Sequence, residues 1–313
     1  MDRRGFLKGA VTSALSLASA KGLPAAADAA PEAVVRFGIV SDIHFAERAM
    51  RPDGAPVGDR HYSESCAKLR EAVGVMNASK VDFVIELGDF KDLTVDREGT
   101  LRCLDAIEAT FAGFRGDRFH VPGNHDFDCL TPEEFFEHIQ NAGQERTLAH
   151  YSFVRNGVTF VVLDGCYDSD MRHYSRCTPW YDSNVPPHEV AWLKAELDRA
   201  AGKVIVFCHQ RLDVKAWERH AVRNAAEIRA LMEASGKVLA VFTGHEHFGG
   251  GGRFNGIAYY SIRGMVVGQG EDESGYAVVS VLRDGTVSVK GYRKAESVCY
   301  RAESGAQGKE VKS

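Results

Sequence analysis

Six short apolar runs recur along the chain, and they constrain its fold more than any other feature. They span residues 34–40, 81–87, 118–122, 158–164, 203–208 and 237–243. Runs of this length that are rich in Val, Ile and Phe are typical of strands buried on both faces. The pattern therefore predicts strands that are covered on both sides by other parts of the chain.

Amphipathic segments separate many of these runs. Residues 62–78, 187–200 and 221–234 each place apolar side chains on one helical face. Alternating strands and helices predict a layered α/β fold. The segment 256–294 differs, because Gly and Asp-Gly turns separate its apolar runs. We therefore expect antiparallel strands and hairpins there.

The first thirty residues form a separate segment. Arg3 and Arg4 precede Phe6-Leu7-Lys8 and an apolar run that ends at Ala20, which resembles a twin-arginine export signal. The run is too short and too weakly apolar to span a bilayer, so we expect no stable membrane anchor. This interpretation predicts a partnership with the twin-arginine export machinery and a periplasmic or secreted protein. The expected organisation is a signal peptide over 1–30, a main domain over 31–300 and a flexible tail over 301–313.

Polar donor side chains follow five of the six apolar runs. In chain order they are Asp42 and His44, then Asp89, then Asn124, His125 and Asp126, then His209, and finally His245 and His247. Ligands of open α/β sheets bind beyond the carboxyl ends of the strands. We therefore expect these side chains to converge in space although they are scattered in sequence.

Seven of these donors have the chemistry of a metal site. The set is Asp42, His44, Asp89, Asn124, His209, His245 and His247. It contains no thiolate, and the seven cysteines of the chain include no C-x-x-C pair. Mixed carboxylate and imidazole donors suit Mn, Fe, Zn or Co. Seven donors are too many for one ion, so we expect two divalent metal ions with one carboxylate as a bridge.

The five blocks D-x-H, G-D, G-N-H-D, H and G-H-x-H occur in this order between about Phe37 and His247. Together they resemble the calcineurin-like metallophosphoesterase superfamily. The resemblance implies a four-layer α/β/β/α metallophosphoesterase sandwich with mixed sheets and, in this chain, a C-terminal antiparallel strand region. It implies that one metal ion is bound by Asp42, His44 and His247, the other by Asn124, His209 and His245, and both by Asp89.

The same resemblance implies the catalytic residues. His125 would lie beside the metals as the acid or as a stabiliser of the transition state, and Asp126 would orient its ring. A metal-bridging hydroxide would attack a phosphodiester or phosphoanhydride. Arg60, Lys91 and Arg211 lie near ligands in sequence and are candidate substrate contacts, with solvated surface as the alternative.

A long turn-rich stretch, residues 165–186, adds one further candidate. Trp180 and Tyr181 within it could cover the pocket and stack against a base. Ordinary packing within the loop is the alternative.

A finer resemblance concerns the substrate. Residues 58–73, 150–165 and 256–294 are similar to manganese-dependent ADP-ribose/CDP-alcohol diphosphatases, although those enzymes usually carry Gln where this chain has His44. Position 92 is Asp, where purple acid phosphatases carry Tyr. The best hypothesis is a nucleoside-diphosphate-linked small molecule as substrate. A cyclic-nucleotide phosphodiesterase and a broad-specificity phosphomonoesterase are the alternatives.

Two other classes of function are disfavoured. The formal net charge of −5 and the lack of a basic stripe are unlike a nucleic-acid-binding protein, so we expect no nucleic-acid partner. A non-catalytic metal-binding protein on this fold would be expected to lack His125 or a ligand, and none is missing.

Overall fold

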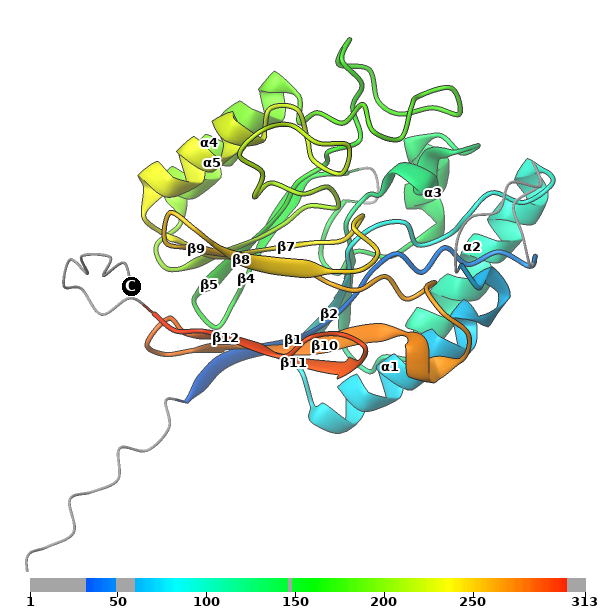
Figure 1. Ribbon diagram of the computed structural model, residues 1–313, viewed down its shortest axis with the longest axis horizontal. Coiled ribbons are helices and arrows are strands. Elements are labelled where there is room, and N and C mark those ends of the chain that lie inside the picture. The colour runs from blue at the N-terminus through cyan, green and yellow to red at the C-terminus, as the bar shows by residue number, and fades with distance from the viewer. Residues whose placement is uncertain (1–31, 49–59, 146–147, 303–313) are drawn as a thin grey trace, which may run out of the picture. The chain divides into compact units, whose positions relative to one another are not determined.

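Two six-stranded sheets lie face to face in the structure, a computed structural model that describes residues 32–48, 60–145 and 148–302 (Figure 1). The expected signal peptide lies outside the described residues, as does nearly all of the expected tail. Among the described residues, no helix combines the length and the apolar character needed to cross a bilayer.

The first sheet has the strand order β12-β11-β10-β1-β2-β3. Its parallel half consists of β1 (Ala33–Val40), β2 (Phe83–Glu86) and β3 (Asp117–His120). Its antiparallel half consists of β10 (Gly275–Leu282), β11 (Val287–Arg293) and β12 (Val298–Tyr300), and β10 pairs with β1. The hairpin expected near the C-terminus is confirmed for β10 and β11.

The second sheet has the order β4-β5-β6-β7-β9-β8. Its strands are β4 (Tyr151–Arg155), β5 (Val158–Val162), β6 (Val204–Phe207), β7 (Val238–Thr243), β8 (Gly250–Phe254) and β9 (Ile257–Ser261). Antiparallel strands were expected over 256–294; β9 pairs antiparallel with β8 in this way, but on its other side it runs parallel to β7. The reason is that the intervening strand β8 reverses the chain, so that β9 returns beside β7 in the same direction.

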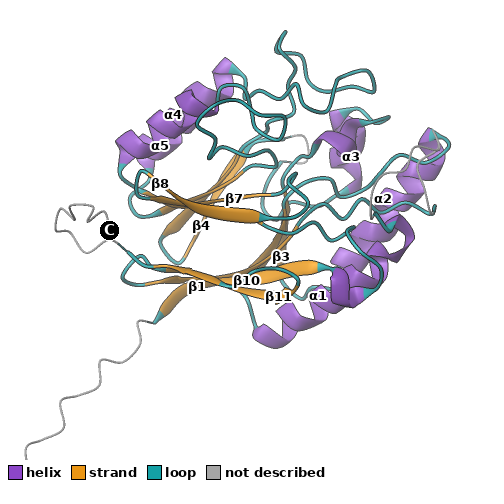
Figure 2. Ribbon diagram, in the orientation of Figure 1, coloured by secondary structure: helices purple, strands orange, loops and turns teal. Residues whose placement is uncertain are grey.

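Helices cover the outer face of each sheet (Figure 2). On the first sheet these are α1 (Ser65–Ser79), α2 (Arg97–Phe111) and the short α3 (Pro132–His138), and on the second they are α4 (Pro187–Arg199) and α5 (Ala225–Ser235). Short 3₁₀ turns span Tyr62–Glu64, Asn124–Phe127 and Glu271–Glu273. The Asp96 side chain caps α2 by accepting the N–H of Gly99 at 2.6 Å.

Alternation along the strands creates separate apolar layers. Phe37 on β1 stacks on Phe83 with ring centroids 5.1 Å apart, and it meets Phe160 and Phe207 of the other sheet edge to face. The neighbouring Gly38 faces α1, where an added Cβ would lie 2.5 Å from the sulfur of Met76. A core between the sheets and one under each helix layer confirm the four-layer α/β/β/α sandwich.

Candidate metal centre

The carboxyl ends of β1, β2, β3, β6 and β7 meet at one edge of the sandwich, and backbone hydrogen bonds fix their loops together. The N–H of Asp42 donates to Gly88 O at 3.0 Å, and that of His44 donates to Asp89 O at 2.8 Å. A Cβ at Gly123 would lie 2.1 Å from the backbone nitrogen of Asp89, so only glycine permits this approach of the loops.

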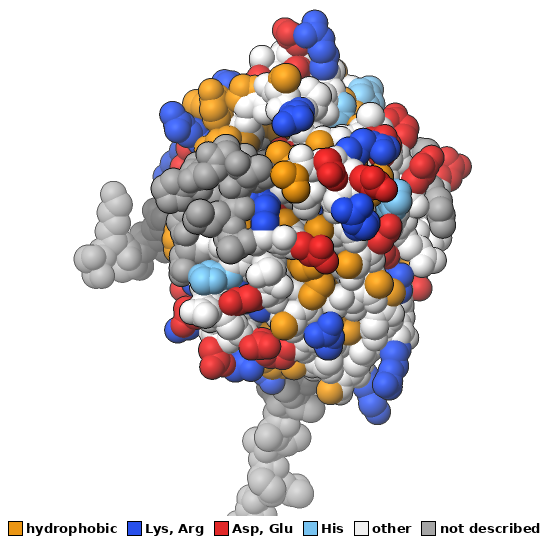
Figure 3. Space-filling model, turned by 90° about the vertical axis from the view of Figure 1, so that its right-hand side faces the viewer, with side chains coloured by type: hydrophobic (Ala, Val, Ile, Leu, Met, Phe, Trp, Pro, Cys, Tyr) orange, Lys and Arg blue, Asp and Glu red, His pale blue; other side chains and the backbone are white. Residues whose placement is uncertain are grey.

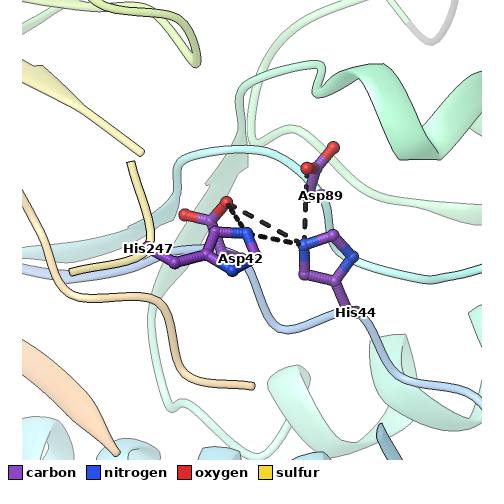
Figure 4. Close-up of side chains that lie close together, drawn as sticks. All are labelled: Asp42, His44, Asp89 and His247. Atoms are coloured by element: carbon purple, nitrogen blue, oxygen red, sulfur yellow. Dashed lines mark hydrogen bonds and ion pairs between the residues drawn. The ribbon is translucent and has the colours of Figure 1, made fainter. Parts of the chain in front are cut away.

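Four donors form a first cluster: Asp42, His44, Asp89 and His247 (Figure 4). His44 Nε2 lies 3.2 Å from His247 Nε2 and 3.4 Å from Asp89 Oδ2. His247 Nε2 lies 3.2 Å from Asp42 Oδ1. All four converge on one point, as the ligands of a single ion would.

A second cluster contains Asp89, His209 and His245. His209 Nε2 lies 3.2 Å from Asp89 Oδ2 and 3.1 Å from His245 Nδ1. The carboxylate of Asp89 therefore belongs to both clusters, which is the position that a bridging ligand needs.

A buried polar atom shows how a metal ion would fit. Asn124 Oδ1 is buried and has no hydrogen-bond partner within the described part of the chain. Burying such an atom without a partner is unfavourable. Coordination of a cation would satisfy it, and the carboxylate and imidazole donors of the two clusters suit two divalent ions.

Four of the donor residues adopt left-handed backbone conformations. The φ angles are 51° at Asp42, 47° at His44, 60° at Asp89 and 64° at His245. Asp and His tolerate this region better than most residues, yet it is sparsely populated and recurs at functional sites. These conformations turn the side chains from the strand ends towards a common point.

In two of the histidines, the ring nitrogen that faces away from the clusters has an acceptor. His209 Nδ1 lies 2.7 Å from Leu87 O, and His44 Nδ1 lies 3.1 Å from Asp92 Oδ2. Asp92 in turn accepts from Arg48 at 2.5 Å. These contacts hold both rings with Nε2 towards the clusters, as is usual for metal-binding histidines.

Electrostatic coupling sets the protonation of the clusters. Burial disfavours ionisation of Asp42 and Asp89, but the adjacent imidazoles outweigh it and keep both pKa values below the ordinary value. Burial opposes the charge on His209 as well, yet Asp89 and Asp42 raise its pKa to about 9. Burial and the charge of His209 hold the pKa of His245 well below normal. A cation that binds Nε2 of His209 would therefore displace a proton.

The ring of His125 lies beside the first cluster, with its centroid 4.8 Å from that of His44. Its Nδ1 lies 2.7 Å from Asp128 Oδ2. The expectation that Asp126 orients this ring is wrong, because Asp128 makes the contact with Nδ1. The carboxylate of Asp126 instead accepts the backbone N–H groups of Phe90 and Gly123, both at 2.9 Å, because it points under the neighbouring strand-end loop.

The three expected substrate contacts occupy different positions. Lys91 is fully buried and donates to the backbone oxygen of His125, so it supports the turn that carries His125 and is not free to bind a phosphate. Arg211 is held by Asp213 at 2.9 Å and by Glu218 at 2.6 Å and lies outside the cavity of the site. Arg60 does line this cavity, and its Nη1 is buried without a partner in the described chain.

The cavity over the clusters has a volume of about 260 Å³. Two of its lining residues, Trp180 and His220, come from loops that carry none of the metal-site motifs. For Trp180, lining of the pocket was one of two open interpretations. His220 lies in none of the five sequence blocks, and no local sequence signal distinguishes it from other loop histidines.

Comparison with known proteins identifies the family of this arrangement. The family model described as calcineurin-like phosphoesterase matches residues 35–249. The chain is 26% identical over 261 residues to a manganese-dependent ADP-ribose/CDP-alcohol diphosphatase of Oryza sativa subsp. japonica, covering 70% of this chain and 79% of that protein. A protein of the same description from Arabidopsis thaliana is 24% identical over 262 residues, covering 71% and 83%.

Solved structures show the same architecture. A dimetal phosphatase from Danio rerio matches with a TM-score of 0.74 and 20% identity, covering 87% of this chain and 100% of that one. A purple acid phosphatase from yellow lupin seeds matches with a TM-score of 0.57 and 13% identity, covering 85% and 52%. At these identities the structural likeness establishes the fold alone.

Proposed function

Because the chain belongs to the calcineurin-like phosphoesterase family, we propose that it hydrolyses the phosphoanhydride of a nucleoside-diphosphate-linked small molecule with two divalent metal ions. That it is a hydrolase of phosphoric ester or anhydride bonds follows from the family. The observation that carries the two-metal proposal is the position of Asp89. Its Oδ2 lies 3.4 Å from His44 Nε2 in one cluster and 3.2 Å from His209 Nε2 in the other.

The proposed metal ligands are those implied by the sequence blocks. Asp42, His44 and His247 would hold one ion, Asn124, His209 and His245 the other, and Asp89 both. When bound, such a pair activates water and neutralises the charge on the phosphoryl group. Manganese is the first candidate because the relatives are described as manganese-dependent, with Fe, Zn and Co as alternatives.

His125 is proposed to protonate the leaving oxygen. Its Nδ1 is engaged by Asp128, and the ring lines the cavity, which leaves Nε2 for the substrate. Burial works against a charge on this ring, but Asp128, Asp89 and Asp92 raise the pKa of His125 to about 9. A raised pKa favours the protonated imidazole, which is the form that general-acid catalysis requires.

A small-molecule substrate is consistent with the surface and the cavity. Figure 3 shows acidic and basic side chains interspersed on one face, without a continuous basic stripe among the described residues drawn there. Arg60 adds one cation to the cavity wall. The relatives act, by their descriptions, on ADP-ribose and CDP-alcohols, which supports a diphosphate as the substrate of this chain.

The decisive experiment combines metal and substrate panels. Metal-free protein is reloaded separately with Mn, Zn, Fe, Co or Mg and assayed with ADP-ribose, a CDP-alcohol, 3′,5′-cyclic AMP and p-nitrophenyl phosphate. We expect hydrolysis of the two diphosphates to be fastest, with two ions per chain by elemental analysis. A preference for cyclic AMP or for the monoester would instead support the alternative functions.

Export through the twin-arginine pathway is a separate proposal. It rests on Arg3 and Arg4 with the following Phe6-Leu7-Lys8, all outside the described residues. Replacing Arg3 and Arg4 by lysine should retain the protein inside the cell, whereas the wild type is recovered from the periplasm or medium. Unimpaired export of the double variant would contradict this route.

A further inference from the structure

Trp180 differs in chemistry from the rest of the cavity over the metal clusters. The other lining residues, such as Arg60, Asp89, Asn124 and His125, carry charged or polar groups that suit phosphate and metal ions. Trp180 contributes a large apolar ring, and 38% of the residue is exposed. The ring packs beside His220 and His245 but stays partly exposed in the cavity wall, so part of it is available to a ligand.

Hydrogen bonds fix the loop that carries Trp180. Tyr174 Oη lies 2.7 Å from Ser183 Oγ and donates to Trp180 O at 3.4 Å. Asp182 accepts from Arg223 Nε at 2.7 Å and from the N–H of Ser169 at 3.0 Å. Because both sides of the loop are fastened, little ordering is needed when a ligand contacts the ring.

The ring also lies next to the reacting centre. Its centroid is 5.5 Å from that of His245 and 5.3 Å from that of His220. His245 belongs to the second donor cluster. A group attached to a phosphate bound at the clusters is therefore brought within reach of Trp180.

We propose that Trp180, supported by His220, stacks against the base of the nucleotide whose phosphate lies at the metal clusters, and so selects nucleotides over base-free sugar phosphates. The inference rests on the proposed function, because the same cavity binds the phosphate. Stacking on an aromatic side chain tolerates different bases, since every base has a π face. The site would consequently accept both purine and pyrimidine nucleotides.

The chain provides a matched control in Trp217. Trp217 is 43% exposed and comes from the same loop region as His220, but it lies outside the cavity. Arg223 covers it, with the guanidinium carbon 4.5 Å from the ring centroid. Loss of Trp217 removes an exposed tryptophan that does not line the cavity.

The test compares AMP with ribose 5-phosphate, which differ in the presence of the base. Calorimetric titration of the full-length, manganese-loaded protein should show tighter binding of AMP by roughly 5- to 100-fold. Trp180→Ala should reduce AMP affinity to the level of ribose 5-phosphate and leave the latter unchanged. Trp180→Phe should keep most of the preference for AMP over ribose 5-phosphate, and Trp217→Ala should keep all of this preference. Metal content and melting temperature are measured for every variant.

Two results would overturn the inference. The first is that the wild type binds AMP and ribose 5-phosphate with equal affinity. The second is that Trp180→Ala weakens the binding of both ligands by the same factor. If either occurs while the wild type hydrolyses ADP-ribose, base stacking fails and the proposed function stands. If the wild type prefers AMP through Trp180 but hydrolyses no diphosphate, the base site stands and the proposed function fails.

Discussion

Nδ1 of His125 lies 2.7 Å from Oδ2 of Asp128, which follows the same 3₁₀ turn. The nearer neighbour Asp126 accepts backbone N–H groups from the loop after β2 and makes no contact of this kind. The two carboxylates therefore have separate tasks. Asp128 positions the proposed acid, and Asp126 fixes the turn against Asp89.

Asp128→Asn should lower activity about 10- to 100-fold, as is typical for partners that orient a catalytic or ligating ring. The substitution removes one of the three carboxylate charges that raise the pKa of His125. Since an acid acts below its pKa, the loss of activity at high pH should move to lower pH. The measurement is a pH–rate profile with metal content. An unchanged profile would show that Asp128 does not control the ring.

Asp126→Asn provides the contrasting variant. Asn has one acceptor oxygen, so it cannot replace all the backbone contacts of the buried Asp126 carboxylate. We expect a lower melting temperature than for Asp128→Asn. Thermal melts of the two variants decide between the roles, and a larger destabilisation by Asp128→Asn would contradict the assignment.

His125→Ala should retain both metal ions and lose activity by about 10²–10⁴-fold on a substrate with a poor leaving group. For an activated aryl phosphate, whose leaving oxygen needs little protonation, the loss should be smaller. The rates for both substrates are measured alongside metal content. Equal losses would indicate stabilisation of charge at phosphorus, and loss of a metal ion would make His125 a ligand.

Asp89→Asn should impair binding of both ions, because its carboxylate is shared by the two clusters. Asp42→Asn, which alters only the first cluster, should reduce the content towards one ion per chain. Elemental analysis after identical loading and dialysis compares the variants. Full metal content and activity in Asp89→Asn would rule out a bridge at this position.

Glu86→Gln should increase stability, and the gain should grow with pH. Glu86 is fully buried, and both carboxylate oxygens lack partners in the described chain. Burial, with the charges of Asp126, Asp42 and Asp89, raises its folded-state pKa well above normal. In the unfolded chain, the carboxyl group of Glu86 ionises above its ordinary pKa of about 4.3. In the folded protein it stays protonated until the pH passes its raised pKa. Between these two pKa values the wild type therefore loses stability as the pH rises.

Melting temperatures of Glu86→Gln and the wild type from about pH 5 to about pH 8 test this dependence. The difference between the two proteins should widen across the range. A constant difference would mean that Glu86 is ionised in the folded protein or that its titration does not contribute.

Much of the metal site could be predicted from the sequence alone. The sequence shows directly which donor residues follow each strand, and parallel strands bring their carboxyl ends to one edge of the sheet. The convergence of Asp42, Asp89 and His209 thus followed from order and composition. The four-layer fold was implied by the same blocks, whereas the parallel direction of β9 depends on the reversal through β8 and has no local signature.

Contacts between neighbouring loops were decided only by the tertiary structure. The sequence blocks implied Asp126 as the partner of His125, whereas the turn geometry selects Asp128. Lys91 lies two residues from Asp89 in sequence, yet its side chain is buried against the backbone of His125 and does not line the cavity. Trp180 and His220 reach the site because distant loops close over it. Sequence specifies which groups are available, while loop packing fixes where each one points, because that direction depends on partners far away along the chain.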